Sequence, residues 1–179
     1  LIDLLQHPNP SARHHAAHVL GKIGDSRAVD ALINALQDTD VTVLSKTIFT
    51  LGQLGDVKAV PAIVQLLGHE HHEVQTTVTN ALERFGAAPQ PFLIEALQHE
   101  RWQVREQAAD ILGLIGNREV VPLLANLLTD EHWQVRFSAV TALGHLGGAQ
   151  AKAALQTMAD DPNPKVSGLV TKILKRIKV

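Results

Sequence analysis

The feature that most constrains the fold is a repeat of about 31 residues that runs through the whole sequence. The glycine-containing end of the repeat recurs as VLGKIGD (19–25), TLGQLGD (50–56), ILGLIGN (111–117) and ALGHLGG (142–148), with a weaker copy, ALERFGA (81–87). One small or β-branched position before each copy keeps spacings of 31, 31, 30, 31 and 31 residues, at Ala12, Val43, Val74, Val104, Val135 and Val166. This regularity predicts a stack of six equivalent supersecondary units.

Each unit is typical of two helices joined by a turn. Ala139, Leu143 and Leu146 fall on one stripe at helical spacing, and the same stripe appears in every unit. The second helices are expected near 10–22, 41–53, 72–85, 102–114, 133–145 and 164–178. The first helices are expected near 29–37, 60–68, 90–98, 121–129 and 152–160. Because neither helix could bury its apolar face alone, neighbouring pairs must stack.

Local signals mark the helix ends. Asn9, Asp40 and Asn163 fit N-cap positions, where a side-chain oxygen can accept a hydrogen bond from a free backbone N–H. Glycines are expected to close the second helices in the left-handed conformation, at Gly24, Gly55, Gly86, Gly116 and Gly147. The third unit has Glu83 in place of its first turn glycine and continues into APQP (88–91), which predicts a local change of curvature.

The fold class predicted from these patterns is all-α: a right-handed α-solenoid, or superhelix, of six helix-turn-helix repeats in a single domain over residues 1–179. The expected units cover approximately 1–25, 26–56, 57–87, 88–117, 118–148 and 149–179, with the first one truncated at Leu1. Aromatic residues make up only 3% of the chain, so leucine, alanine and valine must fill the core. Phe85 and Phe92 are the two aromatic residues expected in it.

Composition excludes several functional classes. The chain has no cysteine, which rules out disulfides, thiolate zinc sites, iron–sulfur clusters and a cysteine nucleophile. Lys and Arg number 16 against 18 Asp and Glu, a net charge of −2, so general binding to nucleic acid is not expected. No apolar run reaches the roughly 18–20 residues that span a bilayer, so we expect no membrane partner. These features favour a cytoplasmic protein.

Three segments carry a resemblance to a known family: SARHHAAHVLGKIGD (11–25), VREQAADILGLIGN (104–117) and VRFSAVTALGHLGG (135–148). They resemble the short HEAT-like repeats of the phycobilisome-lyase type, and the resemblance covers essentially the whole chain. It implies HEAT-like helix pairs, but it is unspecific for function. That family includes subunits that attach or detach bilin chromophores, general binding scaffolds and deoxyhypusine hydroxylase.

The hydroxylase activity that the resemblance could imply lacks its residues here. Its di-iron site resembles His-Glu pairs placed early in the second helices. The equivalent positions in this chain are His14-His15, Ser45-Lys46, Thr76-Thr77, Glu106-Gln107, Phe137-Ser138 and Gly168-Leu169. None is His-Glu. No nucleophile motif or phosphate-binding loop is present either, so we expect no enzyme activity and no cofactor.

Positions opposite the buried stripe of the second helices should line a concave surface, as the resemblance implies for this helix row. The candidate partner-binding residues there are His14, His18, Phe49, Asn80, Glu106, Asp110, Phe137 and Thr141. Phe49 and Phe137 are potential aromatic anchors, unless a neighbouring helix covers them. The leading hypothesis is therefore a non-enzymatic scaffold that binds a protein partner on this surface.

Two alternatives remain from the sequence. One is a bilin lyase or chromophore-handling subunit of phycobiliprotein assembly or degradation, with a bilin as its small-molecule partner. The other is a metal-binding repeat protein that uses the histidine-rich turn HEHHE (69–73) together with His99, because imidazole and carboxylate groups suit several transition metals. A solvated polar turn explains that cluster equally well, and we predict no metal site.

Overall fold

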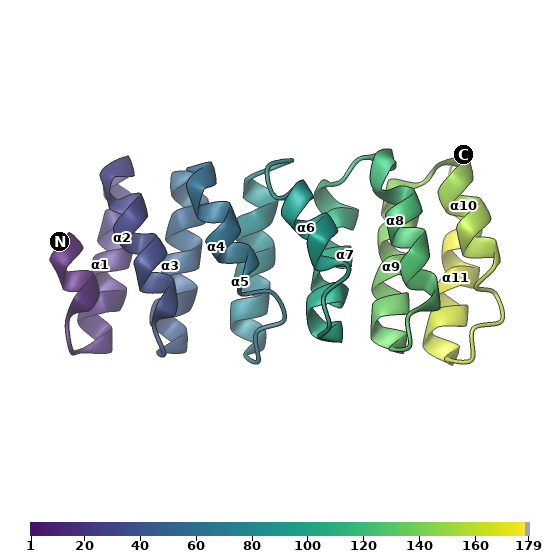
Figure 1. Cartoon of the computed structure of the whole chain (residues 1–179), viewed down its shortest axis with the longest axis horizontal. Helices are drawn as coiled ribbons and strands as arrows, with labels where there is room; N and C mark the ends of the chain where they lie inside the picture. Colours follow the sequence, from purple (N-terminus) through teal and green to yellow (C-terminus); the bar gives the residue numbers. More distant parts are fainter. Residues whose placement is uncertain (178–179) are drawn as a thin grey trace. The chain divides into compact units, whose positions relative to one another are not determined.

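A computed structural model describes residues 1–177, and every regular element in this part of the chain is a helix (Figure 1). The chain divides into two compact units, Leu1–Pro89 and Gln90–Val179, and each is described by itself. Unit 1 contains η1 (Ile2–Gln6), α1 (Pro10–Ile23), η2 (Ser26–Ala28), α2 (Val29–Asn34), η3 (Ala35–Gln37), α3 (Val41–Leu54), η4 (Val57–Ala59), α4 (Val60–Val64) and α5 (His72–Arg84). Unit 2 contains α6 (Gln90–Ala96), α7 (Trp102–Ile115), η5 (Arg118–Val120), α8 (Val121–Asn126), η6 (Leu127–Thr129), α9 (Trp133–Leu146), α10 (Gly148–Gln156) and α11 (Pro164–Leu174).

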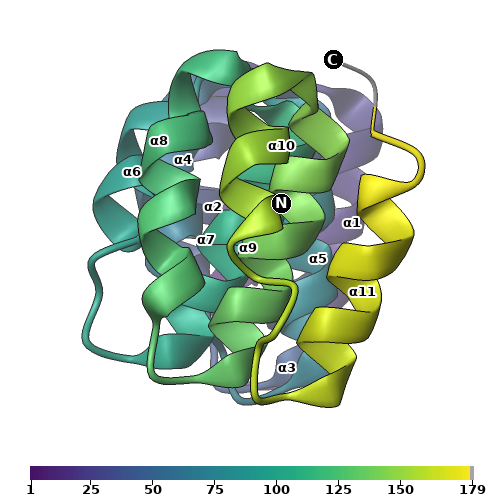
Figure 2. The same ribbon diagram turned by 90° about the vertical axis from the view of Figure 1, so that its right-hand side faces the viewer.

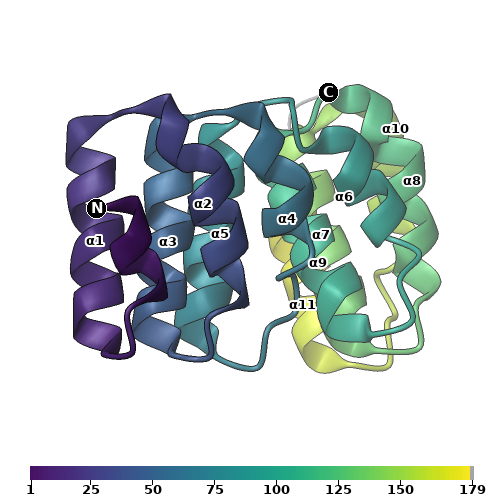
Figure 3. The same cartoon turned by 60° about the vertical axis from the view of Figure 1, so that its left-hand side comes forward.

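The elements form repeated helix pairs, which confirms the predicted all-α, helix-turn-helix architecture. In unit 1, the longer second helices α1, α3 and α5 stand side by side, with the shorter α2 and α4 packed against them (Figure 3). In unit 2, α9 packs between α7 and α11, and α10 pairs with α11 (Figure 2). The prediction that the whole chain is one domain stays a prediction, as does the curvature change after Glu83. Lys178, expected near the end of the last helix, lies outside the described residues.

The predicted N-caps are confirmed. Asn9, Asp40 and Asn163 each accept a hydrogen bond at 2.9 Å from the backbone N–H two residues further on. Gly24 and Gly55 end α1 and α3 in the left-handed conformation, with φ of 74° and 69°. The expectation for Gly116 is wrong, because its φ of −71° and ψ of 163° are those of extended backbone. Gly147 ends α9 with a positive φ of 64°, but its ψ of −163° is not that of the left-handed helical conformation, so this expectation is wrong as well.

None of the six aromatic residues is fully buried. The expectation that Phe92 belongs to the core is wrong, since it is 38% exposed. Phe85 is half-buried. Trp102 stacks on His132 of the next turn, with 5.5 Å between ring centroids. The Lys165 ammonium lies 4.8 Å from the centre of the Trp133 ring. Both tryptophans thus pack across adjacent turns, and the core itself is aliphatic.

Close approach between second helices depends on glycine. A Cβ atom at Gly113 of α7 would lie 2.6 Å from Cα of Ala142 in α9, a separation that real side chains do not reach. Gly52 of α3 faces Ala81 of α5 in the same way, with a separation of 3.1 Å. Most repeat endings thus contain two glycines with different roles. The first, which follows a leucine, lies inside the second helix and allows close packing, and the second ends that helix. The third unit has Glu83 at the position of the first glycine.

Three arginine–aspartate pairs link the start of one second helix to the next turn along the chain. The two residues of each pair are 25 positions apart in the sequence. Each arginine also donates hydrogen bonds from Nη1 to two backbone carbonyls of the turn that precedes its own helix. The pairs are Arg13–Asp38, Arg105–Asp130 and Arg136–Asp161, with Nη2···Oδ1 distances of 2.8, 2.9 and 3.0 Å. The carboxyls are almost fully buried, so these are structural contacts rather than surface ion pairs. The hydrogen bond from Arg136 holds the pKa of Asp161 below its ordinary value, against the opposing effect of burial.

Within residues 1–177, none of the helices is both long enough and apolar enough to cross a membrane.

The glycine contact gives a matched pair of substitutions in unit 2. We expect Gly113→Ala to lower the free energy of unfolding by about 1–3 kcal/mol, because the new methyl group meets backbone atoms of α9. Gly168→Ala should instead raise it by about 1 kcal/mol. Gly168 also lies inside a helix, but a methyl group added there would have no neighbouring atom within 4 Å. Urea unfolding followed by circular dichroism measures both, and equal effects would contradict the packing role.

Removing the Asp161 carboxyl tests the arginine–aspartate pairs. Asp161→Ala should lower the free energy of unfolding at pH 7 by about 3 kcal/mol, because Arg136 keeps a buried charge without its partner. The native pKa of Asp161 is lowered, so its stabilising contribution is present above the ordinary value of 3.8 and disappears as the pH falls through the lowered value. The difference between the variant and the wild type should therefore shrink below about pH 4. Arg27→Ala is the control and should cost less than about 1 kcal/mol, since the side chain of Arg27 is 86% exposed.

Candidate functional site

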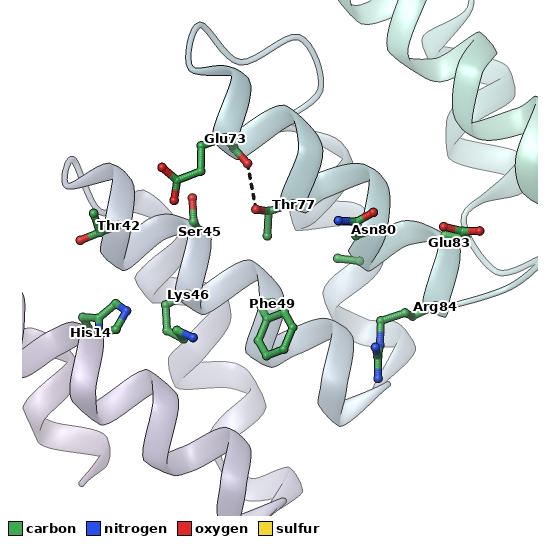
Figure 4. Close-up of a pocket in the computed structure, with 11 residues that line it drawn as sticks. His14, Thr42, Ser45, Lys46, Phe49, Glu73, Thr77, Asn80, Glu83 and Arg84 are labelled. Atoms are coloured by element: carbon green, nitrogen blue, oxygen red, sulfur yellow. Dashed lines mark hydrogen bonds between the residues drawn. The ribbon is translucent and has the colours of Figure 1, made fainter.

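A cavity of about 730 Å³ opens on the second-helix face of unit 1 (Figure 4). We call it the unit 1 groove. It is lined by His14 of α1, by Thr42, Ser45, Lys46 and Phe49 of α3, and by Glu73, Thr77, Asn80, Ala81, Glu83 and Arg84 of α5. The α5 residues Glu73, Thr77, Asn80 and Arg84 are spaced by four, three and four positions, which places them on one face of the helix.

Phe49 is the main apolar side chain of the groove. It is 42% exposed, and the Lys46 ammonium lies 5.1 Å from the centre of its ring. Figure 4 shows both side chains on the same face of α3, between His14 of α1 and Arg84 of α5. A cation over an aromatic face is stabilising, but it leaves the rest of the ring available to a ligand.

The rim of the groove carries both signs of charge. Lys46 and Arg84 are the cations, and Glu73 and Glu83 are the carboxylates. Arg84 donates a hydrogen bond to the carbonyl of Gly52 at 3.3 Å, which directs its guanidinium toward α3. Such a mixed rim suits a polar ligand with charges of both signs better than a simple anion or cation.

Ser45 contributes an unused hydroxyl. The residue is only 7% exposed, and within the described part of the chain its Oγ has no hydrogen-bond partner. In contrast, Thr47 and Thr50 of the same helix donate to the carbonyls of Val43 and Ala17. A buried hydroxyl without a partner costs free energy.

The structure brings together three of the eight sequence-predicted residues, His14, Phe49 and Asn80. His18 also lies on α1 but is not part of the groove lining, and burial is the largest cause of its lowered pKa, followed by Lys22 and Lys46. Sequence reasoning missed Lys46, Thr77 and Arg84 as site residues. The signal was present in the spacing, because Thr77 and Arg84 lie three and four positions from Asn80.

The other four predicted residues lie in unit 2, on α7 and α9. Glu106 and Asp110 are one helical turn apart, and burial is the main cause that raises both pKa values, although part of the Asp110 side chain is exposed. Asp110 also accepts a hydrogen bond from Ser138. Phe137 is half-buried, with its ring packed edge-on against Trp133 at 6.4 Å, so it is less available than Phe49. Thr141 donates to the carbonyl of Phe137 at 3.0 Å.

The histidine-rich turn of unit 1 does not assemble a metal site. The Nδ1 atom of His69 accepts the backbone N–H of His71 at 3.1 Å, so it serves the turn. In unit 2, His99 accepts the N–H of Arg101 at 3.0 Å in the same way. Among residues 1–177, no three histidine, aspartate or glutamate side chains are grouped as metal ligands would be.

Comparison with known families identifies the repeat. The family model for HEAT repeats matches residues 1–46, 29–91 and 90–175, so the chain belongs to the HEAT repeat family. This confirms the resemblance drawn from the sequence. No curated protein sequence matches the chain.

Several solved structures share the fold, and they are HEAT-like and armadillo-like α-solenoids. A chain from a structure of microtubule plus end tracking by XMAP215, CLIP-170 and EB1 aligns with a TM-score of 0.72 at 20% identity, over 99% of this chain and 91% of that one. The complex of CpcE and CpcF of phycocyanin lyase from Nostoc sp. PCC7120 gives 0.57 at 26% identity, over 96% and 73%. A designed armadillo repeat protein in complex with the peptide (KR)4 gives 0.56 at 17% identity, over 97% and 96%.

The unpartnered hydroxyl leads to a stability prediction. Ser45→Ala should leave the free energy of unfolding unchanged or raise it by up to about 1 kcal/mol, because it removes a buried polar atom that has no bond to lose. Thr50→Val on the same helix should lower it by about 1 kcal/mol, since it removes the hydrogen bond from α3 to α1. Thermal and urea unfolding of both variants measure the difference. A clear loss for Ser45→Ala would show that this hydroxyl already serves the fold.

Proposed function

We propose that this chain is a non-enzymatic interaction scaffold, and that the unit 1 groove binds a segment of a protein partner. The observation that carries the proposal is Phe49, a ring 42% exposed inside a cavity of about 730 Å³ with polar and charged walls. Isolated aromatic rings of this exposure, surrounded by polar side chains, have the composition of protein-binding hot spots.

The walls of the groove suit a peptide. Asn80 offers an amide that can both donate to and accept from a peptide backbone, and Ser45 offers a hydroxyl that has no partner of its own. The groove is lined by cations, Lys46 and Arg84, and by carboxylates, Glu73 and Glu83, so a segment with charges of both signs finds a complement for each. The groove is built on three helices of one compact unit, which lets it bind without the entropy cost of first ordering a loop.

The same geometry argues against hydrolytic chemistry in the groove. Ser45 is the one buried hydroxyl in its lining without a hydrogen bond, so no base is placed to take its proton. Thr77 donates to the carbonyl of Glu73 at 2.8 Å and is held by its own helix. The proposal therefore assigns no catalytic residue.

Membership of the HEAT repeat family supports a binding role, and two of the similar structures are complexes. One is the designed armadillo protein with its peptide, and the other is the pair CpcE and CpcF.

The likeness to the CpcE and CpcF complex, at 26% identity, also favours a second candidate function, a subunit that handles a bilin chromophore. Visible absorbance of the purified chain after co-expression with a bilin source would support that candidate, and a colourless protein would count against it.

Removing the ring of Phe49 tests the scaffold function. We expect Phe49→Ala to reduce the recovery of partner proteins in affinity capture from the native host by about tenfold or more, because a central anchor contributes a large share of binding. Phe92→Ala is the matched control, since Phe92 is 38% exposed but lies on α6 in unit 2. Quantitative mass spectrometry of the captured proteins gives the readout. Equal recovery with both variants would contradict the role of the groove, and circular dichroism confirms that each variant is folded.

A further inference from the structure

A second cavity, of about 580 Å³, lies within unit 2 between α9 and α11. We call it the unit 2 pocket. Its apolar wall consists of Gly144, Leu146, Leu169, Ile173 and Ile177, and it shares no residue with the unit 1 groove. The volume falls within the roughly 300–1,000 Å³ of clefts that hold ligands.

The pocket lies where the packing contact between second helices differs from the one found elsewhere in unit 2. Gly113 of α7 faces Ala142 of α9, but the equivalent Gly144 of α9 faces Ile173 of α11. A Cβ atom at Gly144 would lie 2.8 Å from Cδ1 of Ile173, so the longer side chain already fills the space beside the glycine. The close glycine–alanine contact between α7 and α9 therefore has no counterpart between α9 and α11, where the pocket lies.

Four basic side chains surround this apolar wall: Arg118 of η5, His145 of α9, Lys172 of α11, and Arg176, which follows the end of α11. No aspartate or glutamate lines the pocket. In the described part of the chain, no ion pair is formed by Arg118, Lys172 or Arg176. Arg118 is held in place by a hydrogen bond to the carbonyl of Leu146 at 3.4 Å. Its charge is therefore fixed at the pocket without being neutralised there.

We propose that the unit 2 pocket binds an acidic segment of a partner protein, with an apolar side chain of that segment inserted between α9 and α11. Aspartate or glutamate residues on either side of the inserted side chain would pair with the surrounding cations. This inference deepens the proposed scaffold function by naming the chemistry of one partner, but it depends on residues that the unit 1 groove does not use.

A peptide fits the distribution of charge better than a small anion. The basic groups come from η5, α9, α11 and the segment that follows α11, so several carboxylates spaced along a chain can each meet one. The single head group of a small apolar acid would engage only part of this set. Complementary charge also gives the site its selectivity, because a basic segment would be repelled by the same residues.

Binding of a defined peptide to the full chain tests the proposal. The probe is a fluorescein-labelled dodecapeptide with a central leucine and phenylalanine flanked by aspartates, and fluorescence anisotropy at about 50 mM NaCl gives its Kd. We expect saturable binding that weakens at least about tenfold when lysines replace the aspartates, or when serines replace the two apolar residues. Raising the salt to about 500 mM should also weaken it, since exposed charge pairs are screened.

A matched pair of charge reversals on α11 and its C-cap locates the site. Lys172→Glu should weaken binding at least about tenfold, whereas Lys175→Glu should change it by less than about threefold. Lys175 changes the net charge equally and lies three residues away, but it does not line the pocket. Both side chains are exposed, so neither variant should disturb folding.

Three outcomes would overturn the proposal: equal weakening by the two variants, equal affinity for the lysine peptide, or full displacement of the peptide by decanoate at similar affinity. The last result would identify a site for small apolar acids. Phe49→Ala should leave peptide affinity unchanged. Peptide binding and partner capture through Phe49 can therefore fail separately, which distinguishes this proposal from the scaffold function.

Discussion

The structure depends on how closely neighbouring second helices can approach. In unit 2, Gly113 lets α9 bring the backbone of Ala142 almost against α7. In unit 1, Gly52 and Ala81 make the equivalent contact between α3 and α5. Each contact buries the leucine and valine stripes of both helices, which supply most of the driving force for a fold so poor in aromatic residues. Where Ile173 stands in place of the small partner, this close contact is absent, and the unit 2 pocket lies beside it.

Buried arginine–aspartate contacts also hold neighbouring repeats together. An arginine at the start of a second helix makes a bidentate hydrogen bond, through Nε and Nη2, to an aspartate in the following turn. These arginines are Arg13, Arg105 and Arg136. The turns that lack this aspartate carry a histidine instead, at positions 7, 69 and 99, and its Nδ1 accepts the same backbone N–H that an aspartate oxygen accepts elsewhere. His7, His69 and His99 are thus explained as acceptors within the fold, which removes much of the reason to assign these three to a metal.

Periodicity predicted the fold well because it reports on burial, which repeats with the helices. The starts of α1, α3 and α11, with the caps Asn9, Asp40 and Asn163, follow directly from local residue chemistry. The extended Gly116 was not predictable from its neighbours, because the glycine is needed to avoid the carbonyl of Leu112, 2.3 Å from where a Cβ would lie. Phe92 was misassigned to the core because an apolar residue in a short helix carries little periodic signal. The groove was only partly predicted: His14, Phe49 and Asn80 were expected to line it, whereas Thr77 and Arg84 were missed although they share the helix face of Asn80.

The two faces of the second helices are under different constraints, which explains how one repeat can carry two different cavities. The buried face must repeat, because each helix needs an apolar stripe to bury, and Leu51, Leu82, Leu112 and Leu143 are all buried. The opposite face carries no such requirement, and its residues differ from helix to helix. On α3 it presents Phe49 beside Lys46, and on α11 it presents Lys172 near Ile173. A groove of mixed charge and a purely basic pocket can therefore arise on the same frame, and each can change without loss of the packing that holds the helices together.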